Sequence, residues 1–482
     1  MNRSLIAIPL LACAFVGCVA KPPGYNENLL KVETPAGWQS TGARMGGPDS
    51  NWIPSFRDQR LSALVNEVRA NNYDLKVAAS RVQQAADDAK IAGARVFPSV
   101  RGGLNGRRQQ QAFIGFPFGE EASMSGMSAD EEAVTKSLSN NFGVSLDIDW
   151  ELDLWGRIRT GQAAAIADFQ ASRLELGGLK SSLSAQTAKV WFAIQEADQQ
   201  LRLAEETLKS YKESERTIGD GFELANLPAS QLRLAKSQTA SAEALVEERR
   251  GQKKIAIRQL QILLGKYPSG KLDTPGRFAS LPKPPPSGLP SDLLHRRADM
   301  IAAERRVAAA DKRIREAKLA ILPQISLTGS GGTASETLRN VLNPDNLVWS
   351  LAGSIAQTLF AGGEIRANVS KRQALAEEAI ANYQRTALGA FSEVENALTA
   401  EDILRRREAA LVRSQNFLQE AYARSLDEYK DGVGDVLTIL TTQQSLLQAK
   451  SQVISIQRMR LENRVDLHLA LGGDFDAREV KQ

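Results

Sequence analysis

Four carboxylates that alternate with apolar residues are the first group of side chains in this sequence that could do chemistry: Asp147, Asp149, Glu151 and Asp153. Several carboxylates close together are typical ligands of Ca²⁺. Alternate residues of a strand, however, lie in a line on one face, with no turn that would wrap them around an ion. The spacing therefore predicts no metal site, but a strand with a negatively charged, wet face.

Other groups that could catalyse a reaction are scarce. The chain has two histidines, His295 and His468, which lie far apart in its 482 residues. Zinc sites and Ser/His or Cys/His catalysis are therefore close to excluded. The glycine-rich stretch 329–332 lacks the Lys-Ser/Thr that a nucleotide site needs. We expect no enzyme and no cofactor.

The charge balance argues against nucleic acid as a partner. The chain has 60 Lys and Arg residues against 56 Asp and Glu, a formal net charge of +4, and no block of basic residues stands out. A nucleic-acid-binding surface needs a concentrated basic patch. We therefore expect no nucleic-acid partner.

The first 17 residues read as an export signal. Arg3 precedes an apolar run, 5–16, which has the length of a signal-peptide core and is too short to span a bilayer. The run ends in Phe-Val-Gly-Cys, which resembles the bacterial lipobox and implies a diacylglycerol and an N-acyl chain on Cys18 after cleavage. A plain secretory signal is the alternative. Either way Cys13 is removed, and the single remaining Cys forms no internal disulfide.

The rest of the chain contains two copies of one unit. Residues 74–98 match residues 299–323 at a constant offset of 225, and both segments end at a proline. At an offset of 207, Gly156-x-Ile-Arg matches Gly363-x-Ile-Arg. The smaller offset places a longer loop in the first repeat, within 109–135. The predicted division is an extension at 18–56, repeat one at 57–266, a Pro-rich linker at 267–290, repeat two at 291–473 and a tail at 474–482.

Residues 141–154 alternate strictly between apolar and polar side chains, which predicts a β-strand. Its length suits a soluble sheet or a tilted transmembrane strand, and the export signal favours the second. Repeat two offers 325–329 and 348–360 as equivalent strands. Aromatic rings with a polar edge are favoured at the membrane interface, and the candidates for that position are Trp52, Trp150, Trp155 and Trp349.

Each repeat begins with a predicted Ala-rich helix without internal proline, at 61–94 and at 292–320. Two much longer helical stretches follow in each repeat: 157–217 with 229–264, and 364–430 with 436–471. At about 1.5 Å per residue, 60 residues span about 90 Å, so such helices must support one another. Seven-residue spacing of apolar side chains predicts coiled-coil seams, at Ile194, Leu201 and Leu208 and at Leu440, Leu447, Ile454 and Leu461.

Two longer motifs are similar to those of a known family. Residues 288–304, Gly-Leu-Pro-Ser-Asp-Leu-Leu-His-Arg-Arg-Ala-Asp-Met-Ile-Ala-Ala-Glu, resemble the mid-chain signature of the TolC-like outer membrane factors, in their lipoprotein (RND efflux, NodT-type) branch. Ala298 stands where that branch usually has Pro. Residues 429–440 look like the family's second helical hairpin tip. The resemblance spans residues 50–473, and its opening motif is matched by Phe56, Asp58, Leu61, Leu64, Asp74, Leu75 and Pro98.

The resemblance implies an α+β membrane protein. Three chains, each giving four strands, would close a 12-stranded β-barrel that a long α-helical barrel continues through the periplasm. Closure leaves no strand edge exposed to lipid. The row Asp147, Asp149, Glu151 and Asp153 would then line a wet barrel lumen and favour cations over anions.

The family also implies a gate at the periplasmic end, built from inward rings of the second hairpin. Leu437 falls on the apolar position, whereas Thr441 stands where relatives carry Asp. Our hypothesis is that Leu437 forms the constriction and that Asp435, nearer the tip, contributes charge or adaptor contact. The alternative is that Leu437 is an ordinary seam residue. The expected adaptor-docking tips lie near Gly221, Pro228, Gly432 and Gly434.

The function that the resemblance implies is a lipid-anchored exit duct in the outer membrane for small toxic compounds or drugs. Its expected partners are two further copies of the chain, a periplasmic adaptor (membrane fusion) protein, a proton-driven RND-type inner-membrane pump and outer membrane lipid. Two alternatives stay open: the channel of an ATP-driven protein secretion system, and a lipid-tethered periplasmic coiled-coil scaffold. The sequence identifies no cargo.

Overall fold

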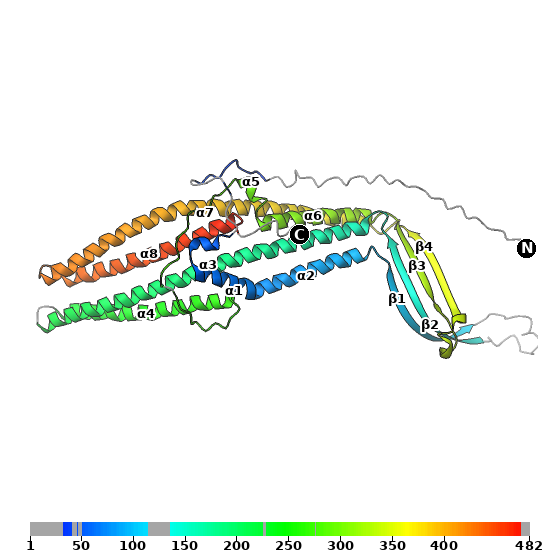
Figure 1. Cartoon of the computed structure of the whole chain (residues 1–482), viewed down its shortest axis with the longest axis horizontal. Coiled ribbons are helices and arrows are strands. Elements are labelled where there is room, and N and C mark those ends of the chain that lie inside the picture. The colour runs from blue at the N-terminus through cyan, green and yellow to red at the C-terminus, as the bar shows by residue number, and fades with distance from the viewer. Residues whose placement is uncertain are drawn as a thin grey trace, which may run out of the picture.

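The computed structural model describes residues 32–40, 46, 51–113, 135–224, 228–274 and 276–473. The export signal, Cys18, the tail at 474–482 and most of the predicted longer loop of repeat one lie outside the described residues. Figure 1 shows an elongated molecule in which long helices run alongside one another and a four-stranded sheet continues them at one end.

The elements follow in the same order in the two halves of the chain. The first half contains α1 Gln59–Asn71, α2 Tyr73–Ala94, β1 Ser99–Phe113, β2 Thr135–Leu152, α3 Arg157–Glu223 and α4 Ala229–Leu263. The second half contains α5 Pro290–Leu293, α6 Ala298–Leu319, β3 Gln324–Thr333, β4 Leu347–Ala356, α7 Glu364–Lys430 and α8 Val436–Ala470. Equivalent helices have equal lengths, which are 22 residues in α2 and α6, 67 in α3 and α7, and 35 in α4 and α8. The predicted internal duplication is therefore confirmed.

The sheet is antiparallel, with the strand order β1-β2-β3-β4. β1 and β4 form its edges, and each has one neighbouring strand within the chain. The predicted strands agree in place but differ in extent: β2 begins at Thr135, β3 continues to Thr333, and β4 ends at Ala356 rather than at residue 360. Strand limits depend on the hydrogen-bonded partner, which the sequence pattern does not contain.

The first helix of repeat one is not continuous, which corrects the prediction of one helix over 61–94. The helix is interrupted at Asn72, between α1 and α2. The Asn72 side chain accepts hydrogen bonds from the backbone N–H groups of Asp74 and Leu75 at 2.9 and 3.2 Å and so caps α2. Its Nδ2 donates to the carbonyl oxygen of Leu263 at 3.0 Å. In repeat two the long helix likewise begins at Ala298, after the short α5, and not at residue 292.

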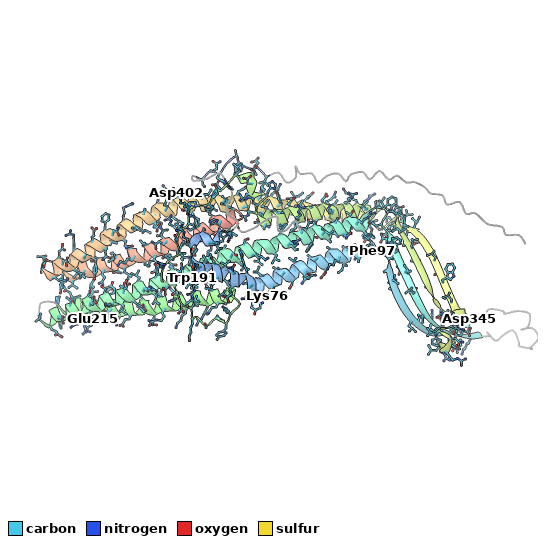
Figure 2. All side chains as sticks on the ribbon, in the orientation of Figure 1. Lys76, Phe97, Trp191, Glu215, Asp345 and Asp402 are labelled. Carbon is cyan, nitrogen blue, oxygen red and sulfur yellow. The ribbon has the colours of Figure 1, made fainter. Side chains whose placement is uncertain are left out.

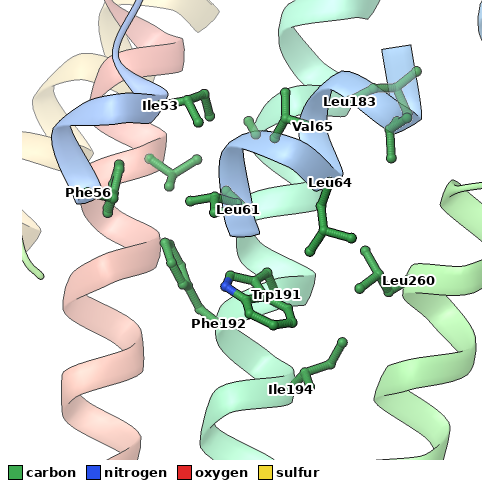
Figure 3. Close-up of a cluster of buried hydrophobic side chains, with 14 of the residues drawn as sticks. Ile53, Phe56, Leu61, Leu64, Val65, Leu183, Trp191, Phe192, Ile194 and Leu260 are labelled. Atoms are coloured by element: carbon green, nitrogen blue, oxygen red, sulfur yellow. The ribbon is translucent and has the colours of Figure 1, made fainter. Parts of the chain in front are cut away.

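The main hydrophobic core lies in the middle of the helical part, where α1 packs against α3, α4 and α8 (Figure 3). Figure 2 labels Trp191 at this level of the molecule. Trp191 and Phe192 of α3 are fully buried, and the ring centroid of Phe192 lies 5.3 Å from that of Phe56. Asp58 fixes this arrangement, because its carboxylate accepts from Leu61 N at 3.0 Å at the start of α1 and from Trp191 Nε1 at 2.8 Å.

Trp52 belongs to this core and not to the membrane interface, which corrects the sequence prediction. It is 1% exposed and its ring stacks on that of His468 in α8, with centroids 5.4 Å apart. A tryptophan near the start of a mature chain gives no signal of its own that separates a buried position from an interfacial one.

The predicted seam of α8 is partly wrong. Leu440 and Leu461 are buried, but Leu447 and Ile454 are only partly buried, and Leu446 is buried instead. α8 packs against both α7 and α3, and a straight helix with 3.6 residues per turn drifts away from a strict seven-residue repeat. Within the described ranges, no helix combines the length and the apolarity needed to cross a bilayer.

Replacing the residue at the break between α1 and α2 should destabilise the helical part. Asn72→Ala removes the cap of α2 and the hydrogen bond to Leu263, and we expect a loss of about 2 kcal/mol from these two contacts. Asn72→Ser, which keeps an oxygen acceptor for the cap, should lose about half as much. The measurement is Tm in detergent, followed by circular dichroism at 222 nm. Equal Tm values for Asn72→Ala and the native protein would contradict the assignment.

Candidate functional site

The sheet has one apolar face and one polar face. Paired residues of an antiparallel sheet point to the same side, and the register places Ile148 opposite both Val100 and Gly329, which faces Leu351. Exposed large side chains share this face: Val100, Leu104, Leu146, Ile148, Trp349, Leu351 and Ile355. The other face carries charged and polar side chains, among them Arg101, Asn105, Asp147, Asp149, Thr328 and Ser330. Where all four strands pair, this face consists mainly of exposed apolar side chains and glycines, and such a surface requires apolar surroundings.

The structure places three of the four predicted carboxylates, Asp147, Asp149 and Glu151, on the polar face of β2. Asp149 forms an ion pair with Arg101 of β1. Glu151 accepts two hydrogen bonds from Nη2 of Arg157, at 2.7 and 2.9 Å. These arginines offset much of the negative charge, so the expected preference for cations is weaker than the row of acids alone indicates. The position of the row in a lumen stays a prediction.

Asp153 does not belong to this row, which corrects the prediction. β2 ends at Leu152, and the Asp153 side chain is only 6% exposed. Its carboxylate accepts from the backbone N–H groups of Ile158 and Arg159 at 3.0 and 2.9 Å, and so stabilises the start of α3. The alternation of the sequence continues past the last strand hydrogen bond, which is why pattern alone misplaces this residue. Among the described residues, no three acidic, His or Cys side chains are placed to hold a metal ion.

Two tryptophans join the sheet to the helices. Trp150 Nε1 donates to the carbonyl oxygen of Val96 at 2.9 Å, and Trp155 Nε1 donates to that of Pro323 at 2.7 Å. Figure 2 labels Phe97 at this junction. A cavity of about 760 Å³ opens here, and its lining includes Phe97, Pro98, Ser99, Asp149, Glu151 and Arg157. The interfacial position of Trp150, Trp155 and Trp349 stays a prediction.

The two helical hairpins end at the same end of the molecule, opposite the sheet (Figure 1). Gly221 lies inside α3, and Pro228 is the residue before α4, with 225–227 outside the described residues. Gly432 and Gly434 lie in the turn between α7 and α8. The predicted tip residues are therefore close to the turns, although Gly221 is part of a helix.

Leu437 is not a seam residue of its own chain. Its side chain is 59% exposed, whereas Val436 and Leu440 are buried in an apolar cluster with Tyr211 of α3. Thr441 is one turn further along α8 on the exposed side, and its hydroxyl donates to the carbonyl oxygen of Leu437 at 2.9 Å. Near the tip, the exposed face of α8 therefore carries the apolar side chain of Leu437, next to a threonine whose hydroxyl is hydrogen-bonded to the backbone of the same helix.

Two glycines and a helix cap fix the conformation of the turn between α7 and α8. Gly432 has φ +77°, which favours glycine, and a Cβ at Gly434 would lie 2.8 Å from the backbone nitrogen of Tyr429. Asp435 caps α8 by accepting from N and Oγ1 of Thr438 at 2.9 and 2.8 Å. These hydrogen bonds from Thr438 lower the pKa of Asp435 below its ordinary value. Asp435 is therefore a charged tip residue at neutral pH.

Residues 32–40, which we call the N-terminal strap, pack on repeat two. Trp38 donates its indole N–H to the carbonyl oxygen of Gly288 at 3.0 Å. Its ring meets that of Phe391 of α7 edge to face, with centroids 6.3 Å apart. The strap follows the predicted lipidation site in the chain, so it connects that site to α7.

Glu395 of α7 is the polar receptor of the strap. Its two carboxylate oxygens accept from the backbone N–H groups of Gln39 and Ser40 at 2.7 and 3.0 Å, and it also accepts from the Ser40 hydroxyl. Burial opposes ionisation of this carboxyl, but the hydrogen bonds from Ser40 and Gln39 outweigh it and hold the pKa of Glu395 below its ordinary value. The ionised form of Glu395 therefore favours the docked strap.

Sequence reasoning missed a group of buried and partly buried charges on α8. Arg464 is 1% exposed and donates to Glu401 of α7 at 2.7 Å, while Arg458 pairs with Glu196 of α3 and with Glu462. Burial raises the pKa of Glu462 against the opposing effect of Arg458. The group joins α8 to α3 and α7. A long helix with a charge every few residues usually presents its charges to water, so the sequence contains no clear signal for this site.

Comparison with known proteins identifies relatives over nearly the whole chain. The outer membrane efflux protein family matches residues 64–266 and 289–473. Pyoverdine export outer membrane protein OpmQ of Pseudomonas putida is 32% identical over 99% of this chain and 98% of its own length. Cation efflux system protein CusC of Escherichia coli is 28% identical over 96% of this chain and 97% of its own length. The solved structure of the Campylobacter jejuni CmeC outer membrane channel, 24% identical, superposes with a TM-score of 0.82 over 91% of this chain and 92% of that chain. These structural neighbours have the TolC-like fold that the sequence motifs imply.

Removing the Glu395 carboxylate should release the N-terminal strap. We expect Glu395→Ala to increase deuterium uptake in peptides that contain Gln39 and Ser40, because both amides lose their acceptor. Glu420→Gln, at an exposed position of the same helix, is the control and should leave uptake unchanged. Because the folded-state pKa is lowered, the contribution of Glu395 is present above its unfolded pKa and is lost as pH falls through the folded pKa. Unchanged uptake in Glu395→Ala would show that the carboxylate does not hold the strap.

Proposed function

Because the chain belongs to the outer membrane efflux protein family, we propose that it is the outer membrane exit duct of a tripartite efflux system for small toxic compounds or drugs. The family is one of outer membrane channels and not of enzymes. Transport through such a duct requires a continuous passage and a source of energy elsewhere in the assembly. The chain's own task is to provide the passage.

The sheet is the observation that carries this proposal. It offers lipid one apolar face, and it leaves β1 and β4 with one partner each. Unpaired backbone N–H and C=O groups cost several kcal/mol each in hydrocarbon, so only closed sheets span membranes. Four strands are too few to close a barrel. Three copies, giving twelve strands, satisfy both the apolar face and the open edges, with the polar face turned to the lumen.

The helical end supports a docking role. Both hairpin tips lie at the end of the molecule farthest from the sheet (Figure 1), and a sheet in the outer membrane directs them into the periplasm. We propose that the tips near Gly221, Pro228, Gly432 and Gly434 dock a periplasmic adaptor, beneath which a proton-driven inner-membrane pump of the RND type supplies energy. This arrangement favours efflux over a simple tethered scaffold, which needs no sheet.

The lipid anchor is a separate part of the proposal. We propose that Cys18 carries a diacylglycerol and an N-acyl chain, and that these are the only attached groups. Thirteen residues lie between Cys18 and the strap, and the fourteen residue steps from position 18 to position 32 span at most about 46–50 Å in an extended chain. α6, with 22 residues, is about 33 Å long. The anchor therefore has the reach to enter the inner leaflet near the junction between helices and sheet.

The cargo is not assigned by similarity. One relative is named for pyoverdine export and another for cation efflux, so chains of this family serve different substances. The ion pairs of Asp149 and Glu151 give the polar face of the sheet a mixture of both signs of charge. Such a surface selects weakly, and we propose that the pump selects the cargo.

Isolation of the assembly tests the function directly. The native protein, crosslinked in cells and purified through a C-terminal tag, should have the mass of a trimer in detergent and should bring with it an adaptor and a proton-driven drug or metal pump. Recovery of an ATP-driven secretion transporter would move the function to protein export. A monomer or dimer without partners would contradict the exit duct.

Substitution of Leu437 tests whether this residue forms the gate. In the trimer its exposed side chain would project from α8 toward the axis, and Leu437→Ala should widen the constriction and raise uptake of vancomycin several-fold in cells. Phe417→Ala removes a side chain that is 68% exposed on α7, away from the tip, and should leave uptake unchanged. Equal uptake in Leu437→Ala and native cells, at equal protein levels, would remove Leu437 from the gate.

A further inference from the structure

The internal duplication extends to the hydrogen-bond register of the two β-hairpins. In the first hairpin Ser99 pairs with Asp149. Adding the offsets of 225 and 207 residues found in the sequence converts this pair into Gln324 and Ala356, which pair in the second hairpin. The two repeats therefore carry the same strand pairing, residue for residue.

Contacts where the sheet meets the helices follow the same offsets. Trp150 Nε1 donates to the carbonyl oxygen of Val96, and at the equivalent positions Gln357 Nε2 donates to that of Ile321, at 3.3 Å. A glycine with positive φ precedes each long helix, Gly156 at +75° and Gly363 at +90°. A side-chain contact and a backbone conformation thus support the offsets independently of the strands.

The two repeats are joined within the chain by one strand pairing. β2, the second strand of repeat one, pairs with β3, the first strand of repeat two, from Ser145↔Gly332 to Leu152↔Ile325. The equivalent contact of repeat two would join β4 to the first strand of a further repeat. No further strand follows β4 among the described residues, and the chain's own β1 lies at the opposite edge of the sheet, so the partner of β4 would be β1 of another copy.

We propose that β4 of one copy pairs with β1 of the next copy in the register that β2 forms with β3. Applied to the observed pairs, the offsets place Ala352 opposite Arg107 of the neighbouring copy, and Leu359 opposite its Val100. The register extends β4 beyond Ala356, where it ends in the single chain. It rests on the proposed trimer and specifies which residues meet in it.

The faces of the two strands agree with this register. Odd-numbered residues of β4, such as Leu351 and Ile355, lie on the apolar face, whereas in β1 the even-numbered residues, such as Leu104, lie there. The register pairs odd with even residues, so Ile355 meets Leu104 and Ser354 meets Asn105. A slip of one residue would bring apolar side chains to the polar face. The register therefore keeps apolar side chains beside apolar ones and polar side chains beside polar ones across the joint between copies.

The register also gives two exposed apolar side chains a partner. Leu359 and Phe360 are 91% and 89% exposed in the single chain. In the proposed pairing they lie beside Val100 and Ser99 of the neighbouring copy, at the mouth of the cavity lined by Phe97 and Ser99. The junction cavity of one copy is then completed by the chain that follows it around the barrel.

Paired cysteines test the register, because the mature chain has no cysteine besides Cys18. Two matched double variants are Ser354→Cys with Asn105→Cys and Ile355→Cys with Leu104→Cys. Cα atoms of directly opposed residues are about 4.5–5.5 Å apart, within the range of a disulfide. Two control variants keep the face but shift the register by two residues: Ser354→Cys with Arg107→Cys, and Ser354→Cys with Gly103→Cys. Their diagonal separation of about 7–8 Å exceeds that range.

Oxidation of the full-length protein in membranes should convert the matched variants into covalent dimers and trimers on non-reducing gels, and leave the shifted variants as monomers. Preferential crosslinking of a shifted variant would overturn the register and leave the trimer intact. Native mass spectrometry of the same samples separates the remaining outcomes. Trimers in which neither set crosslinks would show that β4 and β1 are not partners, and monomers would overturn both the register and the proposed duct.

Discussion

The open edges of the four-stranded sheet are the constraint on which the rest of the structure depends. A membrane offers no water to the backbone groups of an edge strand, so β1 and β4 both need a partner. The apolar face formed by residues such as Leu104 and Leu351 needs lipid at the same time. A single chain satisfies neither need. Oligomerisation is therefore a condition of stability for this fold and not an addition to it, and the duplicated chain supplies two hairpins per copy toward closure.

The length of the helices imposes a second condition. A helix of 67 residues spans about 100 Å and has no globular core to hold it. Support comes at separate levels along its length: the core around Trp191, the ion pairs of the partly buried Arg458 and the buried Arg464, and the apolar cluster near the tips. Asp58 matters at the first of these levels, because one carboxylate caps α1 and anchors Trp191 of α3. Local helix propensity alone would not keep such helices in register.

Features of the chain that repeat could be predicted from the sequence. The bounds of α7, residues 364–430, agree with the prediction, because Gly363 precedes the helix and a charged turn that contains glycine follows it. Features that depend on a distant partner could not. The break at Asn72 depends on the carbonyl of Leu263, and the burial of Trp52 depends on His468. Among the site residues, the carboxylates of β2 were found by alternation, whereas the pairing of Glu151 with Arg157 and the strap receptor Glu395 required the folded chain.

The differences between the two repeats show how a duplicated chain separates contacts within a copy from contacts between copies. At equivalent positions after the second strand of each hairpin, repeat one has Asp153, whose side chain is 6% exposed and caps α3, and repeat two has the exposed Phe360. Asp153 stabilises the start of the helix that follows it. Phe360 stays exposed in the single chain and, in the proposed register, lies beside the neighbouring copy. Likewise Trp155, bonded to Pro323 within the chain, is replaced by Gly362, whose φ of +58° suits a turn. Both differences lie where the internal joint and the proposed joint between copies must differ, while the two hairpins keep the same strand register.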